Sequence, residues 1–86
     1  MFKLVFKNSV KKDIKNFDKH KLRNIAQTIN SLKNNPLPEG VKKIKGGSEP
    51  YYRIRQGDYR IGYRINLDIK AVEAVFIRRR SGKTYR

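Results

Sequence analysis

Arginines in the second half of the chain offer most of the chemistry that this sequence contains. Eight of the nine arginines lie from residue 53 onward, whereas ten of the thirteen lysines lie before residue 44. A guanidinium group can hold a phosphate with two parallel hydrogen bonds and can stack on a base, whereas lysines on helices usually supply solvated charge. The segregation therefore predicts a phosphate-binding site in the second half, with the lysines adding general attraction to a polyanion.

Two stretches with strand-like alternation, residues 51–55 and 58–66, bring four of these arginines together. Successive side chains of a strand point to opposite faces, so alternate positions share a face. The apolar members of both stretches then form a buried face and the arginines form the opposite one. The arginines expected on this exposed face are Arg53, Arg55, Arg60 and Arg64.

The register between these two strands depends on the loop that joins them. A two-residue loop at Gln56–Gly57 places Arg53 directly across from Arg60. A three-residue loop would place Ile61 opposite Arg53 and would mix apolar with charged residues on both faces. We therefore predict the two-residue loop, at the cost of repulsion between the two opposed arginines.

The end of the last predicted strand adds a second basic group. Arg78, Arg79 and Arg80 are followed by a polar segment that contains Lys83 and Tyr85. An aromatic residue in a polar segment has no core to fill, so we expect Tyr85 to stack on a base or to donate a hydrogen bond from its hydroxyl. Lys83 does not belong to a phosphate-binding P-loop, because the upstream glycine of that motif is missing.

The composition predicts one small domain, residues 1–86, with a polyanionic partner. The 86 residues include 22 lysines and arginines against 7 acidic residues, a formal net charge of +15. A chain of this length can bury one core and has no room for a second module, which excludes a two-domain enzyme. So large a basic excess favours nucleic acid as the partner.

The residue types that the sequence lacks exclude several kinds of site. Without cysteine there is no disulfide framework, no thiol nucleophile and no cysteine-bound zinc, and a single histidine argues against a transition-metal site. We therefore expect no metal and no cofactor. Lysine and arginine interrupt every apolar stretch, so none approaches the ~20 apolar residues of a membrane span. The N-terminal residues alternate, unlike a signal peptide, and we expect a cytoplasmic protein.

Hydrophobic periodicity predicts an α+β domain. A strand covers residues 2–6, and a helical hairpin follows, its first helix capped by Asn8 or Ser9 and its second by Asp18. Asn34-Asn35-Pro36 ends the second helix. The pattern of the remaining residues predicts strands separated by turn residues. We therefore expect a mainly antiparallel sheet with both helices on one face. The four further strands are expected at about residues 42–45, 51–55, 58–66 and 70–78.

The hairpin and the basic segment that follows the last strand resemble the RelE/ParE toxin superfamily. The matching segments are Lys45-Gly46, the run Tyr-Arg-Ile-Arg-Gln-Gly-Asp-Tyr-Arg-Ile-Gly-Tyr from Tyr52 to Tyr63, Arg78-Arg79-Arg80, and Tyr85. The resemblance extends over nearly the whole chain, including its size, its helical hairpin and its basic charge. It implies a RelE-like microbial RNase fold and a toxin of a type II toxin–antitoxin pair.

The RelE branch of this superfamily implies a metal-independent endoribonuclease that cuts mRNA in the ribosomal A site. The RNA 2′-OH attacks the adjacent phosphate and leaves a 2′,3′-cyclic phosphate and a 5′-OH, so the protein has to move protons and stabilise charge. The resemblance gives catalytic roles to Arg53 and Arg55 on the first hairpin strand, Arg60 as the phosphate clamp, Arg79 at the leaving 5′-oxygen, and Tyr85 in orienting the substrate. It implies an auxiliary phosphate contact at Lys45. From their charge and position, we expect further contacts with RNA or phosphate at Arg64, Arg78, Arg80 and Lys83.

Two features leave parts of this site open. Well-studied relatives have lysines where this chain has Arg53 and Arg55, and a guanidinium group is a poor base. The general base is therefore not identified, and Tyr85 or electrostatic activation of the 2′-OH could take its place. The spacing to Tyr85 also allows either Arg79 or Arg80 to be the catalytic arginine.

The resemblance also implies partners and leaves two alternative functions. The partners are the ribosome, mRNA and an acidic antitoxin, whose complex with the toxin can bind operator DNA through the antitoxin. An acidic segment that folds on binding would neutralise the exposed arginines. The alternatives are a ParE-like inhibitor of DNA gyrase and a nonenzymatic RNA-binding protein.

Overall fold

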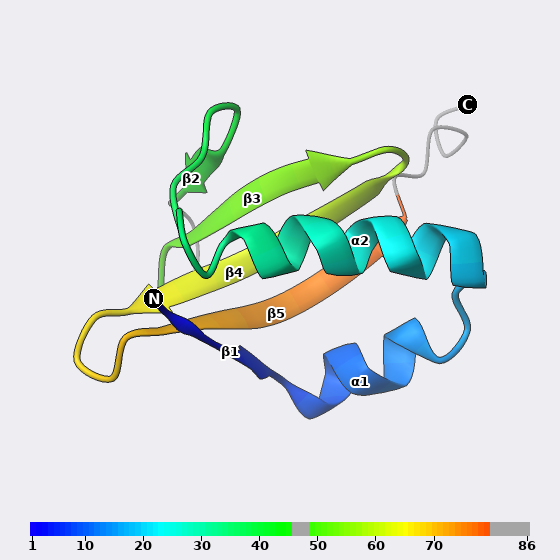
Figure 1. Ribbon diagram of the computed structural model, residues 1–86, viewed down its shortest axis with the longest axis horizontal. Helices are drawn as coiled ribbons and strands as arrows, with labels where there is room; N and C mark the ends of the chain where they lie inside the picture. Colours follow the sequence, from blue (N-terminus) through cyan, green and yellow to red (C-terminus); the bar gives the residue numbers. More distant parts are fainter. Residues whose placement is uncertain (46–48, 80–86) are drawn as a thin grey trace.

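The computed structural model describes residues 1–45 and 49–79, which form a five-stranded sheet and two helices (Figure 1). The expected order of strand, two helices and four further strands is confirmed. The elements are β1 (Lys3–Phe6), α1 (Asn8–Ile14), α2 (Lys19–Ser31), β2 (Lys42–Ile44), β3 (Tyr51–Gln56), β4 (Tyr59–Asn66) and β5 (Ala71–Arg79).

The strands of the sheet follow the order β1-β5-β4-β3-β2. β1 lies parallel to β5, and the other three neighbouring pairs are antiparallel. The chain therefore crosses over between β1 and the rest of the sheet through both helices and then adds strands by successive antiparallel connections. The α+β fold with a mainly antiparallel sheet is confirmed, and each expected strand boundary lies within one residue of the observed one.

One of the two helices has an N-cap with a side-chain hydrogen bond, and the other does not. The Asp18 side chain accepts a hydrogen bond of 3.1 Å from the backbone N–H of His20, so the expected cap of α2 is confirmed. The expected cap of α1 was wrong, because Asn8 and Ser9 lie within the helix and Lys7 occupies the cap position without a side-chain hydrogen bond. Neither helix of the described part of the chain is long and apolar enough to cross a membrane.

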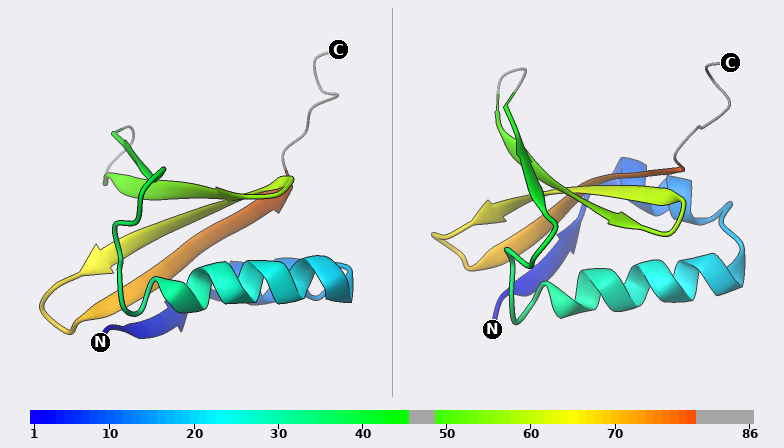
Figure 2. Two further views of the ribbon diagram at one scale, coloured as in Figure 1. Left: turned by 45° about the horizontal axis from the view of Figure 1, so that its top comes forward. Right: turned by 90° about the horizontal axis from the view of Figure 1, so that it is seen from above.

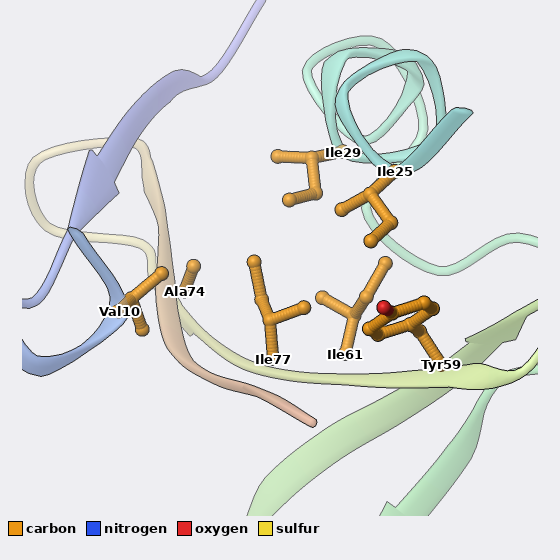
Figure 3. Packing of buried hydrophobic residues seen from close by; sticks show 7 residues of the cluster. All are labelled: Val10, Ile25, Ile29, Tyr59, Ile61, Ala74 and Ile77. Carbon is orange, nitrogen blue, oxygen red and sulfur yellow. The ribbon is translucent and has the colours of Figure 1, made fainter. Parts of the chain in front are cut away.

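Both helices lie on the same side of the sheet (Figure 2). In the close view of Figure 3, side chains of α1 and α2 converge with alternate side chains of β4 and β5. This main core cluster consists of Val10, Ile25, Ile29, Tyr59, Ile61, Ala74 and Ile77, all at most 8% exposed. The face of the sheet toward the helices is thus the buried one, as the alternation of the strands predicted.

A second buried cluster, formed by Leu32, Tyr63 and Val72, anchors the loop after α2. The Tyr63 hydroxyl donates a hydrogen bond of 2.6 Å to the carbonyl oxygen of Pro36. Burial, with a smaller contribution from Tyr52, raises the pKa of Tyr63 to about 12. The neutral hydroxyl therefore holds the loop that leads into β2.

Candidate nucleic-acid interface

The face of the sheet that points away from the helices, which we call the open face, carries three arginines in register on neighbouring strands. Arg55 of β3 is paired with Arg60 of β4, which is paired with Arg78 of β5. Residues paired directly across antiparallel strands share a face and have Cα atoms about 4.5–5.5 Å apart. We call Arg55, Arg60 and Arg78 the arginine row. Like charges in register repel, and a bound polyanion would relieve that repulsion.

The β3–β4 register differs by two residues from the predicted one. Arg53 is paired with Gly62 and not with Arg60, so that prediction was wrong. The loop has the expected two residues but consists of Gly57–Asp58. Gly57 has a φ of +58°, as the first residue of a type II′ turn requires. A shift by two residues keeps every side chain on its face, so Arg53, Arg55 and Arg60 still share the open face.

A β-bulge in β5 decides which arginine near the end of that strand joins the row. The β4–β5 register shifts in the middle of the strands, where the pairing skips Val75. Beyond this point Arg78 is paired with Arg60, and Arg79 is paired with Tyr59 of the core face. Because an extra residue reverses the alternation, the uninterrupted register would have turned Arg78 toward the helices. Arg79 is exposed at the strand end, on the opposite face from the row.

A depression of about 350 Å³ lies beside Arg53 and Arg55 at the edge of the sheet. β2 pairs with β3 only as far as Arg53, so the end of β3 has no neighbouring strand on that side within the described residues. The residues that line the depression are Glu39, Gly40, Lys42, Arg53, Ile54 and Arg55. The lining of the depression therefore combines one acidic residue, Glu39, with three basic residues.

Arg64 lies in a different electrostatic environment from the arginine row. Its Nε lies 3.1 Å from Glu49 Oε1, and its partner on β5 is Glu73. The Arg64 N–H is not aligned for a hydrogen bond to Glu49, so the contact is an ion pair only. The Nε atoms of Arg60 and Arg64 are both buried without a hydrogen-bond partner among the described residues. Arg60 differs from Arg64 because its neighbours on both adjacent strands are arginines. Arg64 is therefore partly neutralised within the protein, and Arg60 is not.

The other predicted site residues lie at or beyond the ends of the described segments. Lys45 is exposed and directly follows β2. Arg80, Lys83 and Tyr85 lie outside the described residues. The described part of the site therefore consists of the arginine row, Arg53 and the depression at the sheet edge.

An aromatic pair on the open face was missed by the sequence analysis. The rings of Phe76 and Tyr51 meet edge to face, with centroids 5.4 Å apart and an interplanar angle of 81°. Phe76 lies in an apolar run of β5 that reads as core, and only the bulge turns it outward. The available signal was Gly62, since a glycine inside a strand often marks a bulge or a close approach.

Two acidic side chains of residues 1–45 and 49–79 form ion pairs, those of Glu49 and Asp58. Asp58 at the tip of the β3–β4 hairpin lies 3.6 Å from the Nζ of Lys21, which links the hairpin to α2. No three His, Cys, Asp or Glu side chains gather within these residues as a metal site would require.

An apolar groove lies on the helical side of the molecule. It has a volume of about 590 Å³ and runs between α2 and the edge of the sheet near β1. Its lining residues are Leu4, Phe6, Ile14, Leu22, Arg23, Ile25, Ala26, Gln27, Ile29, Asn30 and Ile77. The molecule thus has two distinct surfaces, one basic and one apolar.

Residues 4–83 match the family described as "ParE toxin of type II toxin-antitoxin system, parDE". The chain belongs to the RelE/ParE toxin superfamily. Its sequence is 40% identical over 70 residues to toxin RelE3 of Methanocaldococcus jannaschii. The aligned region covers 77% of this chain and 78% of the relative.

Solved structures from this superfamily have the same fold. A chain of the archaeal RelE–RelB complex from Pyrococcus horikoshii OT3 superposes with a TM-score of 0.79 at 25% identity, over 92% of this chain and 94% of that one. A chain of the RelB–RelE antitoxin–toxin complex from Methanococcus jannaschii superposes with a TM-score of 0.70 at 32% identity, over 91% and 92%. RelE and ParE names both occur among the matches, so the residues of the site have to distinguish between their activities.

Proposed function

We propose that this protein is the toxin of a RelBE-type pair and a metal-independent endoribonuclease that cuts mRNA in the ribosomal A site. The observation that supports this most is the arginine row, Arg55, Arg60 and Arg78, on a sheet face that no described element covers. Arginine forms bidentate contacts with phosphate and stays charged throughout the reaction.

The proposed reaction is an internal transfer at phosphorus. The 2′-oxygen of the RNA forms a bond to phosphorus while the bond from phosphorus to the 5′-oxygen breaks, which yields a 2′,3′-cyclic phosphate and a 5′-OH. The proton of the 2′-OH passes to a base, and the 5′-oxygen takes a proton from water, so that the number of protons is conserved. Cations aimed at the charge that develops on the phosphate oxygens lower the barrier, and loss of one such donor costs about 10²–10³ in rate.

The roles within the site follow from the faces of the strands. We assign the phosphate clamp to Arg60 and stabilisation of the leaving 5′-oxygen to Arg78, because these two side chains share the open face. Arg79 lies on the other face of the strand end and is assigned no contact with the reacting phosphate. We propose that Tyr85 orients the substrate. Glu39 is the carboxylate in the depression beside Arg53 and Arg55, and we propose it as the proton acceptor for the 2′-OH, since guanidinium groups do not accept protons.

We also propose a cognate acidic antitoxin and a cytoplasmic site of action. The similar chains from P. horikoshii and M. jannaschii were solved with RelB. The net charge of +15 favours an acidic partner, and the apolar groove along α2 offers it a surface to bury. Operator DNA would then be bound through the antitoxin.

The deciding experiment is primer extension on mRNA translated in the presence of the purified protein. We expect A-site cuts that carry 2′,3′-cyclic phosphate and 5′-OH ends. An intact message together with inhibited gyrase supercoiling would establish the ParE-like activity instead. An intact message with unaffected gyrase and strong RNA binding would support the nonenzymatic alternative.

A further inference from the structure

Phe76, Tyr51 and Gly62 form an aromatic platform on the open face. The Phe76 ring lies against the backbone of Gly62 so closely that a Cβ at position 62 would collide with three of its ring carbons. Tyr51 holds the ring edge to face, and both aromatic side chains are half-buried. The ring is thus packed on the Gly62 backbone and held in place by Tyr51.

The platform has no role in the core. The core clusters gather on the helical side, where Ile61 and Ile77 point, whereas the paired positions Gly62 and Phe76 point to the open face. A glycine inside a strand weakens the strand, and an aromatic ring packed across it offsets part of that loss. The pair therefore strengthens the sheet outside the core, and it places the ring on the face that carries the arginine row.

The platform lies one step along the strands from the arginine row. Phe76 and Arg78 are two residues apart in β5, a distance of about 6.8 Å along a strand, as are Gly62 and Arg60 in β4. The Arg78 guanidinium carbon lies 5.0 Å from the centroid of the Phe76 ring. A flat apolar surface and a phosphate-binding pair of arginines are therefore separated by about the length of one nucleotide of an extended single strand.

We propose that the platform binds one unpaired nucleobase of the RNA, on the nucleotide whose phosphate lies on Arg60 and Arg78. The site assignment rests on the proposed ribonuclease function, but the stacking itself does not require cleavage. The base stacks on Phe76, and Arg78, which covers the ring in the free protein, moves onto the phosphate. Because every base has a π-face, the platform accepts all four bases.

The test compares two short single-stranded 2′-O-methyl RNA backbones that cannot be cleaved. Both have the same phosphates, and one carries a single adenine while the other carries no base. The ratio of their dissociation constants isolates stacking from phosphate attraction. We expect the wild-type protein to prefer the adenine-bearing strand by roughly 5- to 140-fold, the range for stacking on one aromatic residue.

Substitutions assign this preference to the platform. Phe76→Leu should bring the ratio close to one, and Phe76→Tyr should retain it. Phe76→Met serves as a second ring-free variant if Phe76→Leu does not fold, as judged by circular dichroism. Arg60→Ala should weaken binding of both strands and leave their ratio unchanged. Tyr52→Leu, next to Tyr51 but on the helical face, is the matched control and should also leave the ratio unchanged.

Two results would overturn the inference: a wild-type ratio near one, or a ratio that persists in both Phe76→Leu and Phe76→Met. Either result leaves the proposed nuclease function untouched, because the primer-extension assay tests that separately. If instead the wild-type protein cuts no mRNA but the ratio behaves as expected, the base subsite stands and the ribonuclease assignment fails.

Discussion

The two faces of the sheet differ in the burial of their side chains and in the pairing of their polar groups. On the helical face, side chains such as Ile61, Tyr63 and Ile77 are at most 2% exposed, and the Tyr63 hydroxyl has its hydrogen-bond partner. On the open face, arginines are paired with arginines, and the buried Nε of Arg60 has no partner among the described residues. The helical face minimises the free energy of the isolated chain, whereas the open face does not.

This difference indicates that the open face carries the functional site. Like charges placed directly opposite each other destabilise a sheet, and local rules are broken mainly at functional sites. Arg64 lies on the same face but has two acidic neighbours, Glu49 and Glu73. An arginine on this face can therefore be neutralised within the protein. The absence of such neighbours around Arg60 and Arg78 in the β3–β5 register marks the arginine row as the surface kept for a ligand.

The largest expected effect is on cleavage. Arg60→Ala should lower the rate of A-site cutting by about 10²–10³, because it removes the central cation of the row. Arg60→Lys retains the charge but not the bidentate geometry and should recover only part of the rate. The rates are measured by primer extension at saturating toxin.

Arg64→Ala is the matched control for this comparison. Its charge is already paired with Glu49, so its loss should cost no more than about fivefold. Equal losses for Arg60→Ala and Arg64→Ala would show that the open face acts only through its total charge and that the arginine row has no special role.

The second prediction concerns the helical side. Ala26→Glu places a carboxylate in the apolar groove of α2 and should weaken antitoxin binding by roughly 10²-fold, since a buried, unpaired charge is costly. Asn24→Glu makes the same charge change on α2 outside the groove lining and should have a much smaller effect. Calorimetric titration with the antitoxin measures both. Unchanged binding by Ala26→Glu would place the antitoxin elsewhere.

The smallest expected effect is a decrease in the free energy of unfolding at alkaline pH. The folded pKa of Tyr63 is about 12 and its usual value is 10.0, so the unfolded chain loses this proton first. The stabilisation from Tyr63 is fully present below pH 10 and is lost as the pH rises toward 12. By linkage, the free energy of unfolding should fall by about 2 kcal/mol between pH 9 and pH 12.

Urea titrations of Tyr63→Phe and Tyr51→Phe across this pH range check the alkaline prediction. Tyr63→Phe should flatten this part of the pH profile, whereas Tyr51→Phe, on the open face, should leave it intact. If both variants keep the wild-type slope, the alkaline transition has another origin, and the buried hydroxyl is not its source.

Much of the fold could be predicted from local patterns. The order of elements, the cap of α2 by Asp18 and the face to which each arginine of β3 and β4 belongs all depend on periodicity and short-range chemistry. The predicted partner of Arg60 was wrong because two loop positions preserve the same faces. The pattern decided the face, and the positive φ of Gly57 decided the register.

The parts of the site that could not be predicted depend on contacts between distant segments. The skipped pairing at Val75 turns Phe76 and Arg78 to the open face. No residue in the apolar run of β5 predicts this bulge. The apolar groove likewise requires α2 and β1 to be brought together across the crossover. Such features arise from tertiary packing, which no window of neighbouring residues contains.

The amino-acid sequence by itself determined the basic charge, the segregation of arginine from lysine, the α+β order and the separation of a charged from an apolar face. These properties follow from composition and from a side-chain period of two, which any sheet must obey. Only the tertiary structure decided that Arg78, and not Arg79, stands beside Arg60 and that Phe76 lies on Gly62. The physical reason is that one turn conformation and one bulge set the alignment of three strands, and alignment determines which side chains are neighbours.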